Sequence, residues 1–356
     1  MAGLIATRKD HSGPPRPGLR PRLIGLAATS LLLAACSSGE TTPSPTAADS
    51  SPPATSSASP SGPALPPIAE VDSLGGSTLE VPDADWIAVV DGSAWTTLGR
   101  GVVQQLDGED GALGMEVPVS GPTCTAPDVG FGSLWVAVCD PGAVVRIDPD
   151  TGESQTVDLD GATVQEEGSI AAGEGSVWVV TSAPEHVLLR IDPKRDKLVG
   201  STPLPDGVVA VRAGLGGLWA TDGNRGRLLR LDPDSGDVLK EIQVGSGARF
   251  FDVGEGAVWV QNNTDGTVSR VDPETDQVTA TIVVDSGAID GGDLTVGGGY
   301  VWARVSGSLV AQIDPTTNLV VARIGQPQGS GSAAADDAAV WISAHDRNVV
   351  YRVPLP

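Results

Sequence analysis

The stretch Gly175-Ser176-Val177-Trp178-Val179-Val180, followed by Leu189-Arg190-Ile191-Asp192-Pro193, is the clearest copy of a pattern that recurs along the chain. The tryptophans of the seven copies are Trp95, Trp135, Trp178, Trp219, Trp259, Trp302 and Trp341. Six intervals separate the first from the last, so the mean period is (341 − 95)/6 = 41 residues. A period in the forties with strand-like segments inside it predicts a β-propeller.

Each copy reads as four short strands, A to D, joined by tight turns. In the fifth copy these are residues 250–253, 257–260, 269–271 and 277–283. A glycine-rich turn separates A from B, and an Asp-Pro pair ends strand C because proline lacks an N–H group. We therefore predict an all-β fold over residues 68–356, a seven-bladed β-propeller of four-stranded antiparallel blades with the tryptophans packed between blades.

The last copy ends after its strand C, at residues 349–353, and has no strand D. Residues 77–81 precede the first strand A, at 86–89, and belong to no copy. We predict that this N-terminal strand completes the last blade, because it would cover an open sheet edge and close the ring.

The N-terminus reads as an export signal. Five basic residues precede an apolar stretch at 23–35, which is too short to span a bilayer. It ends in Leu33-Ala34-Ala35-Cys36, which resembles the bacterial lipobox, in which the cysteine is lipidated. The alternative is an ordinary secretory signal cut near Ala35. The resemblance implies a lipoprotein signal peptide at 1–35, lipidation at Cys36, and a protein anchored to the cell membrane that faces the extracytoplasmic side.

Composition sets further limits. Residues 36–67 are rich in Ser, Thr and Pro, which predicts a disordered stalk. The formal net charge is −23, which argues against a nucleic-acid partner, since phosphate binding needs clustered cations. We expect a monomer whose partners are the membrane, reached through the lipid, and an unidentified small ligand or envelope protein.

Cys124 and Cys139 lie at equal distances from the turn at 130–133. Residues equidistant from a hairpin turn face each other, and export places them in an oxidising compartment. We predict a disulfide between them, with Cys124 at the start of strand A; two buried free thiols are the alternative.

Departures from the repeat mark a candidate ligand face on the side of the D–A and B–C loops. Its residues are Arg225, Arg249, Phe250, Asn262, Asp293 and His345. For Arg249 and Phe250, ligand contact and packing both remain open. We predict no metal site, because His186 and His345 follow no ligand spacing, and no cofactor. The paired arginines and aspartates of strand C, such as Arg230 and Asp232, are interpreted as surface ion pairs within a blade.

The pattern Gly-Ser-Val-Trp-Val, then Arg-Ile-Asp-Pro, resembles the YVTN-type and streptogramin-lyase-like propeller repeats of secreted bacterial proteins. The lyase branch carries Glu three residues after the Trp, and His in strand A. Here the corresponding positions are Leu98, Val138, Thr181, Asp222, Asn262, Val305 and Ala344, and no strand A contains His. The resemblance thus favours a tethered, non-catalytic binding module without assigned catalytic residues; the alternative is a propeller enzyme that uses a divalent metal, lyase-like or lactonase-like.

Overall fold

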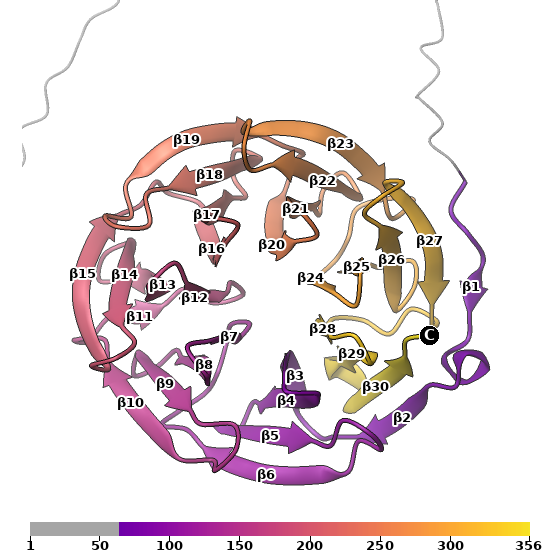
Figure 1. Cartoon of the computed structure of the whole chain (residues 1–356), viewed down its shortest axis with the longest axis horizontal. Coiled ribbons are helices and arrows are strands. Elements are labelled where there is room, and N and C mark those ends of the chain that lie inside the picture. Colours follow the sequence, from indigo (N-terminus) through magenta and orange to yellow (C-terminus); the bar gives the residue numbers. More distant parts are fainter. Residues whose placement is uncertain (1–63) are drawn as a thin grey trace, which may run out of the picture. The chain divides into compact units, whose positions relative to one another are not determined.

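The computed structural model describes residues 64–356, and these form the predicted ring of seven blades (Figure 1). The signal peptide, Cys36 and stalk residues 36–63 lie outside the described residues. Residues 64–67 have neither helix nor strand, and regular structure begins at Ile68.

Strands A to D of each blade lie side by side in that order, with strand A innermost; in blade 3 strand A is split into β11 and β12, which both pair with β13. Blade 1 is β3 (Ala84–Val90), β4 (Ser93–Leu98), β5 (Val102–Leu106) and β6 (Leu113–Pro118). Blade 2 is β7 (Asp128–Gly130), β8 (Ser133–Val138), β9 (Ala143–Ile147) and β10 (Ser154–Asp158). Blade 3 is β11 (Thr163–Val164), β12 (Ile170–Gly173), β13 (Ser176–Ala183), β14 (Val187–Asp192) and β15 (Lys197–Pro203). Blade 4 is β16 (Val208–Gly214), β17 (Gly217–Asp222), β18 (Arg227–Leu231) and β19 (Val238–Gln243).

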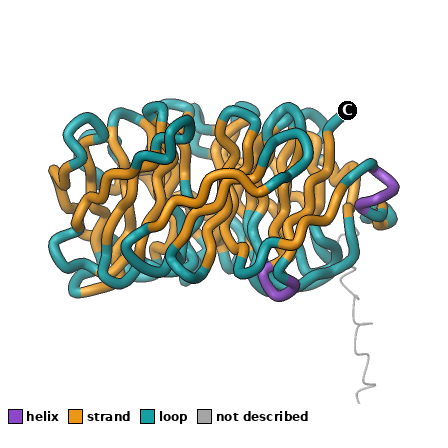
Figure 2. Tube along the Cα trace, turned by 90° about the horizontal axis from the view of Figure 1, so that it is seen from below, coloured by secondary structure: helices purple, strands orange, loops and turns teal. Residues whose placement is uncertain are grey.

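The remaining blades repeat this order. Blade 5 is β20 (Ala248–Gly254), β21 (Ala257–Asn262), β22 (Thr267–Asp272) and β23 (Gln277–Val283). Blade 6 is β24 (Leu294–Gly297), β25 (Tyr300–Arg304), β26 (Val310–Asp314) and β27 (Leu319–Ile324). Blade 7 is β28 (Ala333–Ala335), β29 (Ala339–Ala344), the 3-10 turn η2 (His345–Arg347) and β30 (Val349–Pro354). Figure 2 shows the strands running between two loop-covered faces. Because successive strands of a blade are antiparallel, one face carries the D–A and B–C loops and the other the A–B and C–D turns.

The ring closes as predicted. Strand β2 (Ser77–Glu80) pairs antiparallel with β30, with Leu79 opposite Val350, and so supplies the outer strand of blade 7. The segment before it adds an unpredicted contact, because β1 (Ile68–Ala69) runs parallel to β27 on the outside of blade 6. The 3-10 turn η1 (Val71–Leu74) joins the two. The N-terminal segment therefore joins the last two blades along their outer edges (Figure 1).

The seven repeat tryptophans are all 0% exposed, which confirms their predicted packing role. Directly opposite the tryptophan on strand C, five blades carry an arginine. In four of them the guanidinium lies over the indole ring, 5.1–5.5 Å from its centroid. Cross-strand neighbours share a sheet face, so each of these four arginines covers its own tryptophan.

These arginines do not form the ion pairs predicted within a blade; they reach the C–D turn of the next blade. Arg230 of blade 4 donates to Pro273 O and Asp276 Oδ1 of blade 5, both at 2.9 Å. In the same way, Arg146 of blade 2 bonds the Asp196 side chain of blade 3, and Arg270 of blade 5 bonds the Asn318 side chain of blade 6. The aspartate that begins each turn is occupied locally: Asp272 accepts backbone N–H bonds from Glu274 and Thr275, which lower its pKa. The arginine therefore finds its acceptor in the neighbouring blade.

The predicted disulfide between Cys124 and Cys139 is present, with Cα atoms 6.1 Å apart. The placement of Cys124 at the start of strand A was wrong, because β7 begins only at Asp128. Next to Cys124, Thr123 forms an isolated β-bridge with Val138, and this pairing is shifted by two residues from the register of the hairpin between β7 and β8. The disulfide thus joins the D–A connection of blade 2 to the end of its strand B.

Candidate functional site

The centre of the ring is closed by an aromatic pair. Trp86 of β3 and Phe250 of β20 come from non-adjacent blades, and their ring centroids are 6.0 Å apart at 46°. Each ring is only 3% exposed. Both residues lie at register shifts of strand A, where a bulge redirects a side chain. Because they come early in strand A, they close the channel toward the D–A side.

Below this pair lies a cavity of about 160 Å³, lined by later residues of strand A. Its carboxylates are Asp128, Asp252 and Asp293, and its one arginine is Arg212. Arg212 Nε is 3.7 Å from Asp252 Oδ1, and its Nη1 donates to Ile170 O at 2.8 Å. The cavity is therefore polar and carries more carboxylates than cations.

The three carboxylates join successive blades. Asp128 and Asp252 each accept a backbone N–H of the following blade at 2.8 Å. Asp293 accepts the Ser332 hydroxyl at 2.5 Å and the Ala333 N–H at 3.2 Å. Burial is the main cause that raises the pKa of all three, and these hydrogen bonds oppose it. Their lone pairs are used to hold the innermost strands together, which leaves little for a ligand.

Above the aromatic pair, charged side chains surround the mouth of the channel. Asp85 lies half-buried just before Trp86, and burial raises its pKa to about 6. His345 opposes this rise, whereas the charges of Glu167, Asp293 and Asp346 add to it. These five side chains from four blades therefore lie close enough to interact electrostatically.

Glu167 reaches the mouth because strand A of blade 3 is interrupted between β11 and β12. Its N–H donates to Cys124 O at 2.9 Å, so the disulfide-bonded segment supports this loop. Arg249 faces it, with Nη2 3.8 Å from Glu167 Oε2 and its guanidinium 5.2 Å from the Phe250 ring centroid. Both side chains are about half-exposed, so the pair is accessible to solvent at the rim.

The structure brings together four of the six predicted face residues. Arg249, Phe250, Asp293 and His345 gather around the mouth, with Phe250 and Asp293 buried beneath its rim. Asn262 is 0% exposed, and its amide bonds Thr267, Ser269 and Gly245 inside blade 5.

Arg225 supports the B–C loop of blade 4. It donates to Asp206 O and to the buried carboxylate of Asp222. Asp85 and Trp86 were not singled out from the sequence, although Trp86 is the one tryptophan outside the repeat register and was the available signal.

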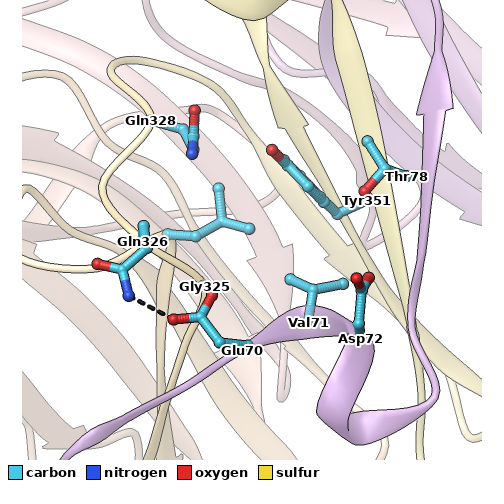
Figure 3. A pocket seen from close by; sticks show the side chains of 9 residues that line it. Glu70, Val71, Asp72, Thr78, Gly325, Gln326, Gln328 and Tyr351 are labelled. Carbon is cyan, nitrogen blue, oxygen red and sulfur yellow. Dashed lines mark hydrogen bonds between the residues drawn. The ribbon is translucent and has the colours of Figure 1, made fainter.

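A second cleft of about 250 Å³ lies where the N-terminal segment crosses blades 6 and 7 (Figure 3). Glu70 and Gln326 meet across it at 2.5 Å, and Tyr351 and Asp72 line its other side. Sequence reasoning missed this cleft because its walls are more than 200 residues apart in the chain. All its polar lining residues except Tyr351 and Gln328 are exposed, so it is a shallow groove.

Two absences concern the described residues alone. Residues 64–356 contain no group of three His, Cys, Asp or Glu side chains placed to hold a metal ion. Within the same range, no helix has the length and apolar character needed to cross a bilayer.

Comparison with known proteins identifies the fold only. No protein-family model matches the chain, and no curated protein sequence matches it. Among solved structures, the chain is similar to the β-propeller domain of Myceliophteria thermophila Cps50 (Swd1), with a TM-score of 0.64, 13% identity, and coverage of 79% of this chain and 98% of that one. It is also similar to the Pan2 WD40 domain of Neurospora crassa, with a TM-score of 0.61, 13% identity, and coverage of 78% of this chain and 90% of that one. A third similar structure is the hydrazine synthase of Kuenenia stuttgartiensis, with a TM-score of 0.64, 16% identity, and coverage of 78% of this chain and 96% of that one.

Proposed function

We propose that this protein is a bacterial cell-surface lipoprotein whose propeller binds an envelope protein or another extracytoplasmic ligand through the face around Asp85. The closed channel is the observation that carries the proposal. Small-molecule sites are typically concave pockets of about 300–1,000 Å³, whereas the cavity below Trp86 and Phe250 measures about 160 Å³. The face around Asp85 has a charged rim over a buried aromatic centre in place of a deep pocket, and such a surface suits a macromolecular partner.

The tether is proposed from the sequence. The basic residues, the apolar stretch at 23–35 and the lipobox-like Leu33-Ala34-Ala35-Cys36 support export and lipidation, and residues 36–67 would hold the propeller away from the membrane. The resemblance to YVTN-type repeats of secreted proteins supports the same location. Substitution Cys36→Ser should move the protein from the membrane fraction to the soluble fraction; unchanged membrane association would contradict the lipid anchor.

Binding of a protein partner can be tested by capture from native envelope extract. The bait is the purified full chain, and the test variant Glu166→Lys/Asp346→Lys reverses two exposed charges at the mouth. The matched control, Glu255→Lys/Asp337→Lys, makes the same change in exposed A–B turns on the opposite face. We expect the control to retain the captured protein and the test variant to lose it. Equal capture by both variants would refute this choice of face.

The enzyme alternative, with a divalent metal in the channel, would need ligands that converge on the axis. Among residues 64–356 no such set occurs, and the axial carboxylates bond to neighbouring strands. Similarity to an enzyme among the structures does not favour catalysis here, since propellers serve many unrelated functions. Stoichiometric divalent metal in the purified protein would favour the enzyme over the binding module.

A further inference from the structure

The C–D turn of blade 3 is basic in a strongly acidic protein. It reads Asp192-Pro193-Lys194-Arg195-Asp196-Lys197, while the chain as a whole has a net charge of −23. The equivalent turns continue after their Asp-Pro with Asp-Thr-Gly, Asp-Ser-Gly, Glu-Thr-Asp and Thr-Thr-Asn. The four lysines of the chain are Lys9, Lys194, Lys197 and Lys240, so half of them lie in this one turn.

Arg190, beside this turn, lacks the side-chain acceptor that comparable arginines have. Arg146, Arg230 and Arg270 each bond an Asp or Asn side chain in the turn of the next blade, at 2.9–3.0 Å. For Arg190 the corresponding position is Gly236, which has no side chain. Arg190 donates instead to the backbone carbonyl of Asp234 and to the Ser176 hydroxyl. Its charge is therefore half-buried and is not neutralised by a carboxylate of blade 4.

A cleft of about 670 Å³ connects these cations. Arg190, Lys194 and Arg195 line it together with two apolar side chains that are unusually exposed, Phe131 (48%) and Val199 (51%). Phe131 has φ = 56°, a left-handed conformation that this position of the A–B turn also has in other blades, for example 47° at Glu174 and 53° at Leu215. The turn holds the Phe131 side chain outward, where it forms an exposed apolar wall of the cleft.

The nearby carboxylates leave a positive excess. Asp196 pairs with Arg146, and Asp192 accepts the Lys194 N–H and lies 3.4 Å from Arg195. Glu174, on the adjacent A–B turn, bonds the Gly216 N–H. Among the described residues, neither Lys194 nor Lys197 has an ion-pair partner. A cleft with three cations and an apolar wall has the chemistry to bind an anion that carries an apolar body.

We propose that this cleft binds a small organic anion, whose phosphate or carboxylate group contacts Arg190, Lys194 and Arg195 while its apolar part covers Phe131 and Val199. The site is on the A–B and C–D face, opposite the proposed partner face, and it does not depend on that function. Asp192 is the only acidic residue that lines this cleft in the described part of the chain.

Calorimetric titration of the full chain with four probes tests the proposal. The probes are 1-naphthyl phosphate, 2-naphthoate, neutral 2-naphthol and inorganic phosphate. We expect saturable binding of at least one naphthyl anion, at least about tenfold tighter than naphthol and inorganic phosphate, because charged hydrogen bonds and apolar burial both contribute. Comparison of the first two probes decides between phosphate and carboxylate.

Three variants locate the binding. Lys194→Gln/Arg195→Gln changes exposed side chains only and should weaken binding of the naphthyl anion about tenfold or more. Phe131→Asn should weaken it too, and asparagine tolerates the positive φ of this turn. The control Lys240→Gln removes an exposed lysine on β19 and should leave binding unchanged. The proposal is overturned if no naphthyl anion binds, if naphthol binds as well as the anions, or if Lys240→Gln weakens binding as much as the turn variant.

Discussion

The contact between Arg230 and the next blade permits a quantitative test of how the ring is held. Arg230→Gln would remove two charged hydrogen bonds, to Pro273 O and Asp276 Oδ1, and the guanidinium above Trp219. Hydrogen bonds to charged groups contribute about 1.5–3 kcal/mol. The side chains of Arg230 and Asp276 are 27% and 17% exposed, so solvent screening reduces this to about 1–2 kcal/mol. With a cation–π contribution of about 0.5 kcal/mol, we expect a total loss of about 2 kcal/mol.

The assay is urea unfolding of a double-mutant cycle made of Arg230→Gln, Asp276→Asn and the combined variant. We expect a coupling free energy of about 1 kcal/mol between the two side chains. The matched control is Arg100→Gln, which breaks a 3.2 Å pair with Glu116 in which both side chains are about half-exposed. That change should cost less than about 0.5 kcal/mol. If Arg230→Gln costs no more than the control, or the coupling is near zero, the contact between blades does not stabilise the ring.

Three further outcomes follow from the structure. Deletion of residues 77–81 removes β2 from blade 7 and should lower the thermal midpoint of the whole ring, whereas an unchanged midpoint would contradict closure by this strand. Replacing Cys124 and Cys139 together by serine should cost about 3 kcal/mol relative to oxidised wild type, the chain-entropy value for a separation of 15 residues, measured by urea unfolding, and reduced wild type should match the variant. Because the pKa of Asp85 is about 6 in the folded protein, above its ordinary value, the favourable effect of its protonation is complete below about pH 4 and is lost as the pH rises through 6. Asp85→Asn should therefore stabilise the protein at pH 7 by on the order of 2 kcal/mol and make its unfolding free energy less dependent on pH between pH 4 and 7. If the unfolding free energies of the variant and wild type change with pH in parallel, the raised pKa of Asp85 is contradicted.

Local chemistry determined most of the fold. The tryptophan period, the glycine-rich turns and the Asp-Pro stops act within a few residues, so each blade could be predicted from its own copy. The position of β2 followed from counting strands, because only the last copy lacked its fourth. The physical cause of each blade thus lies inside a stretch of about one repeat, whereas the closing strand follows from the strand count of the whole chain.

Other features depended on which blades face each other. Trp86 and Phe250 are 164 residues apart, in strand A of two non-adjacent blades; only the closed ring brings their rings to 6.0 Å and so closes the channel. Likewise, Arg230 and Asp232 are near in sequence, yet Arg230 bonds Asp276, because Asp232 is already occupied by its own turn and the next blade presents a second acceptor. Sequence spacing describes the geometry along one strand, whereas these contacts are set by how seven sheets pack around an axis, and that packing exists only once the circle is complete.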